Sequence, residues 1–166
     1  KLVETIEKSN ISAIVAANMA TPVVIFQEMI RFAAANFKGS LKGFKLLITE
    51  SHQSQKSDPS GTAVSLLDFF AELGMPFKKE QIIMVRSPDV QEVTIGIPRT
   101  YLEGHGFHTY KMMSEDGTVA LEFKHNILGR NVYVEGVLKA IRFLAEHKQT
   151  KGRVFSMMDV LRGTGI

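Results

Sequence analysis

The chain has 166 residues, of which 45% are hydrophobic and 22% are charged, a composition typical of a globular domain with its own core. Its net charge of +3 comes from dispersed basic residues, and three tyrosines with no tryptophan offer little to stack on bases, so we expect no nucleic-acid binding. The absence of cysteine excludes disulfides and thiolate metal sites, and no apolar run reaches the roughly 18 residues of a membrane span.

The first residues predict a short helix followed by a buried strand. Leu2, Val3 and Ile6 have helical spacing, and the apolar run over residues 11–17 is typical of a buried parallel strand. A helix and a strand in this position resemble the last unit of an α/β domain. We therefore expect residues 1–18 to belong with a domain that is mostly absent from the chain.

The next segments predict two helices with a strand between them. Thr21 and Pro22 mark a helix start, with the threonine as N-cap, and this helix runs toward Asn36. A strand follows over residues 44–49. After a polar loop, a continuous helix is expected from Ser60 to Leu73.

The second half of the chain predicts mainly strands, then a helix and an apolar end. A Ser-Glu-Asp-Gly turn joins the last two strands as a hairpin. The expected strands are 82–85, 93–97, 106–113 and 119–125, the helix is 131–147, and the apolar segment is 155–161. We predict an α+β fold with a mostly antiparallel or mixed sheet and helices on one face. The other face would be solvated or covered by another subunit, which favours an oligomer.

One loop combines a proton donor, a cation and an anion-friendly backbone. His52 and Lys56 lie four residues apart after the 44–49 strand, and the helix start Ser60-Gly61-Thr62 follows shortly. Helix N-termini bind anions through unpaired N–H groups and the helix dipole, and a glycine there permits close approach. The loop therefore suits a small carboxylate substrate that needs a proton. An exposed polar loop without function explains the same residues equally well.

Other polar clusters give weaker indications. His105, His108 and His125 could in principle bind zinc. Residues three apart on a strand point to opposite faces, however, so we expect no metal site. His125 and Arg130 flank a strand-to-helix connection, and residues 16–19 end a buried strand, where α/β sheets bind ligands. A plain surface loop explains each of these two places as well. No Gly-x-Gly-x-x-Gly follows a strand, so the sequence carries no complete nucleotide site.

The loop sequence at 50–63, E-S-H-Q-S-Q-K-S-D-P-S-G-T-A, resembles the E-[AS]-H-H-x-x-K-x-D-x-P-S-G-T-A pattern of 4-hydroxy-tetrahydrodipicolinate (dihydrodipicolinate) reductases. Gln53 stands where the pattern has its second histidine, and the turn between Asp58 and Pro59 is one residue shorter. Both departures resemble the plant-type branch of the family.

Three further segments follow the order of the family's motifs. They are A-A-N-M at 16–19, which is similar to the hinge; L-E-F-K-H at 121–125 with Arg130, Tyr133 and Gly136; and M-D-V-L at 158–161. The resemblance thus covers nearly the whole chain.

The resemblance implies the substrate-binding and tetramerisation domain of an enzyme in the diaminopimelate route to lysine. That domain would cover 19–150, with 1–18 as a remnant of the nucleotide-binding domain and hinge, and 151–166 packing back on the nucleotide domain. The enzyme would use NADPH or NADH and form a homotetramer in which sheets meet to close a barrel. It would lie in the cytoplasm, or in the plastid stroma of a plant or alga.

The resemblance also implies residue roles. His52 would be the general acid, and Lys56 would bind a substrate carboxylate and could supply a proton. The remaining substrate-binding residues would be Gln53, Ser60, Gly61 and Thr62, and the cofactor-binding residues would be Ala16, Ala17, Asn18, Met19 and Arg130. Two alternatives remain: a reductase-like scaffold that assembles without turnover, and a free-standing anion-binding domain.

Overall fold

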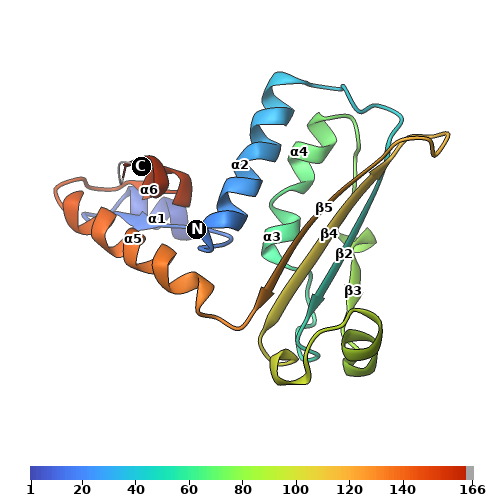
Figure 1. Cartoon of the computed structure of the whole chain (residues 1–166). Helices are drawn as coiled ribbons and strands as arrows, with labels where there is room; N and C mark the ends of the chain where they lie inside the picture. Colours follow the sequence, from blue (N-terminus) through green and yellow to red (C-terminus); the bar gives the residue numbers. More distant parts are fainter. Residues whose placement is uncertain (164–166) are drawn as a thin grey trace. The chain divides into compact units, whose positions relative to one another are not determined.

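The computed structural model describes residues 1–163. The chain divides into two compact units, one formed by Lys1–Glu28 with the chain from Asn131 onward, and one formed by Met29–Arg130. Each unit combines helices with strands (Figure 1), so the predicted α+β class is confirmed. The division differs from the boundaries expected at residues 18 and 150, because the helix after Asn131 groups with the two ends of the chain.

The larger unit is built on a four-stranded sheet in the order β3-β2-β4-β5. β2 (Lys45–His52) pairs in parallel with β3 (Ile83–Val85) and antiparallel with β4 (His105–Met113). β4 also pairs antiparallel with β5 (Ala120–Leu128). The sheet is therefore mixed and mostly antiparallel, as the sequence predicts.

The β4–β5 hairpin closes through the predicted turn. The Ser114 N–H donates to the Val119 carbonyl oxygen at 2.9 Å, and the Asp116 carboxylate accepts from the Ser114 hydroxyl at 2.6 Å. Gly117 has a φ of +74°, which glycine adopts without steric cost. The turn thereby sets the register that brings functional residues together at the far end of the hairpin.

Helices α3 (Gly61–Val64) and α4 (Leu67–Glu72) lie on one face of this sheet (Figure 1). Phe70 of α4 packs on Tyr110 of β4 with ring centroids 5.8 Å apart, and both side chains are fully buried. On β2, the side chain of Ile48 is fully buried, whereas the neighbouring Leu47 points to the other face and is 46% exposed. The helices thus cover one face, as expected.

The single helix predicted from Ser60 to Leu73 is wrong, because the structure breaks it between α3 and α4. The Ser65 hydroxyl donates to the Thr62 carbonyl at 2.9 Å, and the Leu66 N–H donates three residues back to the Ala63 carbonyl. This tight turn lets Leu66 enter the core, where its side chain is fully buried. Burial of Leu66 therefore outweighs helix continuity.

The strand predicted over 93–97 is also wrong. Val90–Thr94 forms a π-helical turn, η2, because Gln91 is buried and its side-chain amide donates to two carbonyls at the sheet end. The acceptors are His52 at 2.7 Å and Val85 at 3.0 Å. These bonds hold the segment across the carboxyl ends of β2 and β3, away from a strand geometry. Two short 3₁₀ turns flank this region, η1 (Lys79–Gln81) and η3 (Arg99–Tyr101).

The smaller unit contains both ends of the described chain. After α1 (Leu2–Glu7), β1 (Ala13–Ile14) pairs in parallel with β6 (Val154–Phe155), and α5 (Val132–Glu146) and α6 (Met157–Gly163) complete the unit. The apolar C-terminal segment predicted to need a partner finds it here. The buried cluster of this unit consists of Val24, Ala140, Phe143, Phe155, Met157, Val160 and Leu161.

Helix α2 (Thr21–Asn36) has residues in both units, and its bounds agree with the prediction. Its cap differs, because the Ala20 carbonyl accepts from both Val23 and Val24, which makes Ala20 the residue before the helix. The Asn18 side-chain oxygen accepts from the Ala20 N–H at 2.8 Å and fixes this entry. Within residues 1–163, no helix has the length and apolar character to cross a membrane.

Gly136 of α5 gives a direct test of packing in the smaller unit. A Cβ at Gly136 would lie 1.8 Å from the Met19 carbonyl oxygen, so Gly136→Ala must shift backbone. We expect the free energy of unfolding to fall by about 1–3 kcal/mol, as for other overpacked sites. Gly104→Ala is the matched control, because a Cβ there meets nothing within 4 Å. Equal urea midpoints for the two variants would contradict this packing.

Candidate active site

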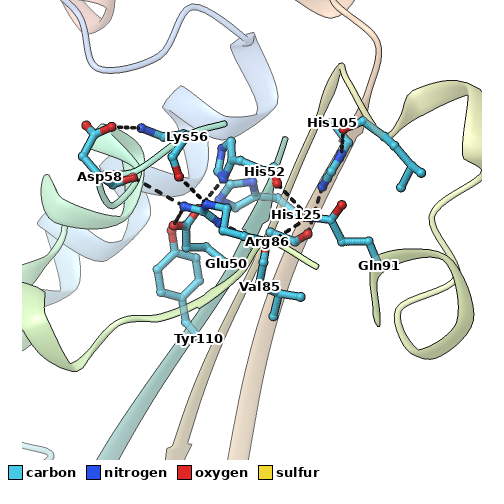
Figure 2. Close-up of polar contacts among 12 residues, drawn as sticks. Glu50, His52, Lys56, Asp58, Val85, Arg86, Gln91, His105, Tyr110 and His125 are labelled. Carbon is cyan, nitrogen blue, oxygen red and sulfur yellow. Dashed lines mark hydrogen bonds and ion pairs between the residues drawn. The ribbon is translucent and has the colours of Figure 1, made fainter. Parts of the chain in front are cut away.

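The candidate site is centred on His52, the last residue of β2. Its Nδ1 contacts the Glu50 carboxylate, and its side chain is 15% exposed. Across the strand pair lies Gly106, where a Cβ would come within 3.3 Å of His52 Nε2, so the glycine makes room for the ring. The imidazole is thus held along one edge by the Glu50 carboxylate (Figure 2), and its side chain is partly exposed.

Glu50 is the buried partner of His52. Its Oε1 accepts from Arg86 Nη2 at 2.5 Å, while its Oε2 faces His52 Nδ1. Burial raises the pKa of the Glu50 carboxyl. Hydrogen bonds and charge interactions with His52 and Arg86 lower it by more, so the net pKa lies below its usual range. Glu50 is therefore a carboxylate that orients the imidazole.

The sequence analysis did not identify Arg86, which also fixes the loop that contains Lys56 and Asp58. Its Nε donates to the Lys56 carbonyl at 2.7 Å and its Nη2 to the Asp58 carbonyl at 3.4 Å (Figure 2). The residue directly follows β3, which runs parallel to β2. Its place at the carboxyl end of a parallel strand is the signal that could have found it.

Lys56 lies in this loop, and its charge is already engaged. Its Nζ donates to Asp58 Oδ1 at 2.9 Å, and this hydrogen bond is the main cause that lowers the pKa of the Asp58 carboxyl. The Lys56 N–H also donates to the Gln53 carbonyl at 3.0 Å, which closes the turn. Since Asp58 is exposed, a ligand carboxylate could replace it at Lys56 at little cost.

The predicted anion-binding residues lie at the start of α3. Ser60 precedes the helix and is buried, as is Thr62, while Gly61 is exposed and a Cβ there would meet nothing within 4 Å. Because α3 has only four residues, its dipole is short. Backbone N–H donors of the first turn, rather than a long helix dipole, would therefore hold an anion here.

His105 has a structural role on the opposite face of the sheet. Its Nε2 lies 2.9 Å from the Ser51 hydroxyl, and its Nδ1 lies 3.1 Å and 3.0 Å from the Tyr101 and Leu102 carbonyls. Burial lowers the pKa of His105. His105 contacts Ser51, whereas His108 lies against His52 and His125, so His105 and His108 point to opposite faces of the sheet.

The buried His108 and the half-buried His125 form a layer beside His52. They are cross-strand partners with ring centroids 4.5 Å apart, and the His108 ring meets the His52 ring edge-on at 5.0 Å. Burial lowers the pKa of His108 to about 2 and that of His125 to about 4, so both rings are neutral near pH 7. The sequence reading did not join them to His52, because that requires the register of three strands.

A family model described as "Dihydrodipicolinate reductase, C-terminus" matches residues 22–161. The chain belongs to this family. A chloroplastic 4-hydroxy-tetrahydrodipicolinate reductase 1 from Arabidopsis thaliana is 40% identical over 98% of the chain and 47% of that relative. A 4-hydroxy-tetrahydrodipicolinate reductase from Methanothermobacter thermautotrophicus is 31% identical over 95% of the chain and 57% of that relative.

A solved structure supports the same fold. The dipicolinate-bound dihydrodipicolinate reductase from Paenisporosarcina sp. TG-14 has a TM-score of 0.52 and 22% identity, covering 93% of the chain and 55% of that protein. The chain spans about half the length of the curated relatives it matches. By its family match, the chain therefore corresponds to the C-terminal part of these longer reductases.

The residues that resemble the reductase family's hinge follow β1 in the smaller unit. β1 runs parallel to β6, and Ala16–Met19 leaves its carboxyl end, where α/β folds place nucleotides. Ala16 and Met19 pack against the core, Ala17 is exposed, and Asn18 is engaged at the start of α2. The backbone at Ala17 thus fits a cofactor contact. Arg130 is exposed and belongs to the other unit.

Removal of the Arg86 guanidinium should strongly destabilise this reductase family member. In Arg86→Met the buried Glu50 carboxylate loses its guanidinium partner, and breaking such a buried pair costs about 3–5 kcal/mol. Arg99→Met is the control, because Arg99 is exposed. The measurement is the midpoint of chemical unfolding for both variants. An equal, small change in both would contradict the role assigned to Arg86.

Proposed function

We propose that the chain is the substrate-binding part of a full-length 4-hydroxy-tetrahydrodipicolinate reductase that uses NADPH or NADH in the lysine (diaminopimelate) pathway. The observation that carries this proposal is the family match over residues 22–161, which includes the His52 loop. The relatives are named for the same reductase activity. The site geometry supports it with an accessible imidazole backed by a buried carboxylate.

The reaction needs a hydride and a proton at different atoms of the substrate. The nicotinamide cofactor, when bound, supplies the hydride. His52 supplies the proton. Its ring is partly exposed, so a ligand can approach within hydrogen-bonding distance on the exposed side. Glu50 stabilises the charged imidazolium before transfer and fixes the ring orientation, as a buried carboxylate does behind other catalytic histidines.

A small dicarboxylate fits the groups around His52. One carboxylate exchanges with Asp58 at the Lys56 ammonium, and Gln53 lies at the turn beside it. The second carboxylate accepts from backbone N–H groups at Gly61, together with the Ser60 and Thr62 hydroxyls. Fixing the ring at two points would supply much of the rate enhancement through positioning.

The cofactor and assembly complete the proposal. Ala16, Ala17, Asn18 and Met19 would contact the cofactor after β1, with Arg130 as a further candidate. Residues 19–150 would form the substrate-binding and tetramerisation domain, and residues 1–18 and 151–166 would belong with the nucleotide-binding domain. The sheet face that carries exposed Leu47 would form the homotetramer interface. The chloroplastic names of the plant relatives support a plastid location over the cytoplasm.

Replacement of His52 tests the proton-donor role. In the full-length protein, His52→Ala should lower kcat by about 100-fold or more, with a smaller change in KM, because general acid catalysis contributes at the transition state. The measurement is NAD(P)H oxidation with substrate generated in situ by the preceding synthase. His147→Gln is the control and should keep wild-type turnover, because His147 lies outside the larger unit that contains His52.

Two outcomes would contradict the proposal. An unchanged kcat in His52→Ala would refute its role as the acid. No turnover in a folded wild-type protein that binds cofactor would favour the reductase-like scaffold.

Gly61→Ala separates ligand contact from stability. A methyl group at Gly61 points into open space, so the unfolding midpoint should not fall, and alanine favours the helix. If a substrate carboxylate approaches this backbone, the methyl group should raise KM by about tenfold, the loss of roughly one charge-assisted hydrogen bond. Gly104→Ala is the open-space control. A KM that matches the control would count against the carboxylate site.

A further inference from the structure

Three metal-ligating side chains meet on the helix-covered face of the sheet. Glu50 and His52 are two residues apart on β2, so they share a face, and His108 is the cross-strand partner of Glu50 on β4. One potential ligand atom from each residue lies within 4.8 Å of the other two. The sequence reading tested zinc only on His105, His108 and His125, and so overlooked this set.

His108 gives independent support for a ligand at this place. Its side chain is 3% exposed, and among residues 1–163 neither of its ring nitrogens has a hydrogen-bond partner. Stacking on His125 and Tyr110 uses the ring faces and leaves the edge of the ring unexplained. A buried imidazole with two unsatisfied nitrogens is rare, and an ion is one of the ordinary explanations.

We propose that Glu50, His52 and His108 form a binding site for a divalent transition metal, with Zn²⁺ as the best match. Two imidazoles and one carboxylate are a known zinc donor set that leaves a fourth position open. Of the three donors, His52 is the one with a partly exposed side chain. A tetrahedral site with Zn–N near 2.1 Å needs ligand atoms about 3.4 Å apart. The Glu50 carboxylate and His52 Nδ1, which are in direct contact, would move apart, and the more distant donor atoms would approach, so side-chain shifts of about 1–1.5 Å would assemble the site.

The neighbours of Glu50 favour this use of its carboxylate. Arg86 occupies Oε1, which leaves Oε2 on the His52 side for a metal, and a hydrogen-bonded carboxylate ligand is typical of zinc sites. The Arg86 charge opposes a second cation and lowers the affinity. Mg²⁺ and Ca²⁺ fit poorly, because they prefer oxygen ligands and two of these three donors are nitrogens.

The consequence for activity rests on the proposed function. A metal on one nitrogen of His52 takes the lone pair that a proton occupies in the imidazolium form. The ring then cannot act as the general acid, so metal binding and proton donation exclude each other. The site would make the reductase reversibly sensitive to Zn²⁺.

Direct binding tests the site without any need for activity. Untagged, metal-free full-length protein is titrated with Co²⁺, whose visible absorption reports four-coordinate nitrogen and oxygen ligands, and Zn²⁺ is then added to displace it. We expect one Co²⁺ per chain, and a loss of affinity of at least about 10–100-fold in His108→Gln. His147→Gln removes a histidine outside the cluster and should bind like the wild type.

A second ligand variant keeps the Co²⁺ titration conclusive. If His108→Gln does not fold, His52→Asn serves in its place, because His52 lies at the solvent edge of the cluster. Wild-type protein that binds no Co²⁺, or a folded ligand variant that binds as tightly as the wild type, would overturn the site.

A separate activity arm tests the inhibitory role. Zn²⁺ should abolish NAD(P)H oxidation by the wild type, and EDTA should restore it. Binding of Zn²⁺ without inhibition would overturn the inhibitory role. A protein that has no reductase activity at all would refute the proposed function, while the Co²⁺ titration would still decide whether the metal site exists.

Discussion

The site depends on one buried carboxylate, that of Glu50. One carboxylate oxygen faces His52 and the other faces Arg86. The Glu50 carboxylate thereby links β2 to the end of β3 and, through Arg86, to the loop that contains Lys56. Burial alone would raise the pKa of the Glu50 carboxyl and favour the neutral acid, and the contacts with His52 and Arg86 reverse that preference. Without this carboxylate, His52 would lose its orientation and Arg86 would lose the anchor from which it holds the loop.

The sequence predicted those elements whose structure depends on local patterns. The bounds of α2, the hairpin turn at 114–117 and the strands β2, β4 and β5 follow from apolar periodicity and turn residues. The predictions that were wrong involve long-range packing. Leu66 breaks a helix to enter the core, and Gln91 converts an expected strand into a π-helical turn through bonds to two distant carbonyls.

The same limit applies to the site. His52, Lys56 and Gly61 could be named from the sequence, because they lie in one continuous motif. Arg86 and His108 could not, because they reach His52 only through strand pairing across 34 and 56 residues of sequence. The structure also pairs Lys56 with Asp58, so a ligand carboxylate would have to replace Asp58 at the Lys56 ammonium.

The measurement that tests this account most directly is a crystal structure of the full-length protein with dipicolinate bound. We expect one carboxylate at the Gly61 backbone, the other at the Lys56 ammonium with Asp58 displaced, and the ring within hydrogen-bond reach of His52. Dipicolinate bound away from the His52 loop, with the Lys56–Asp58 pair intact, would contradict it.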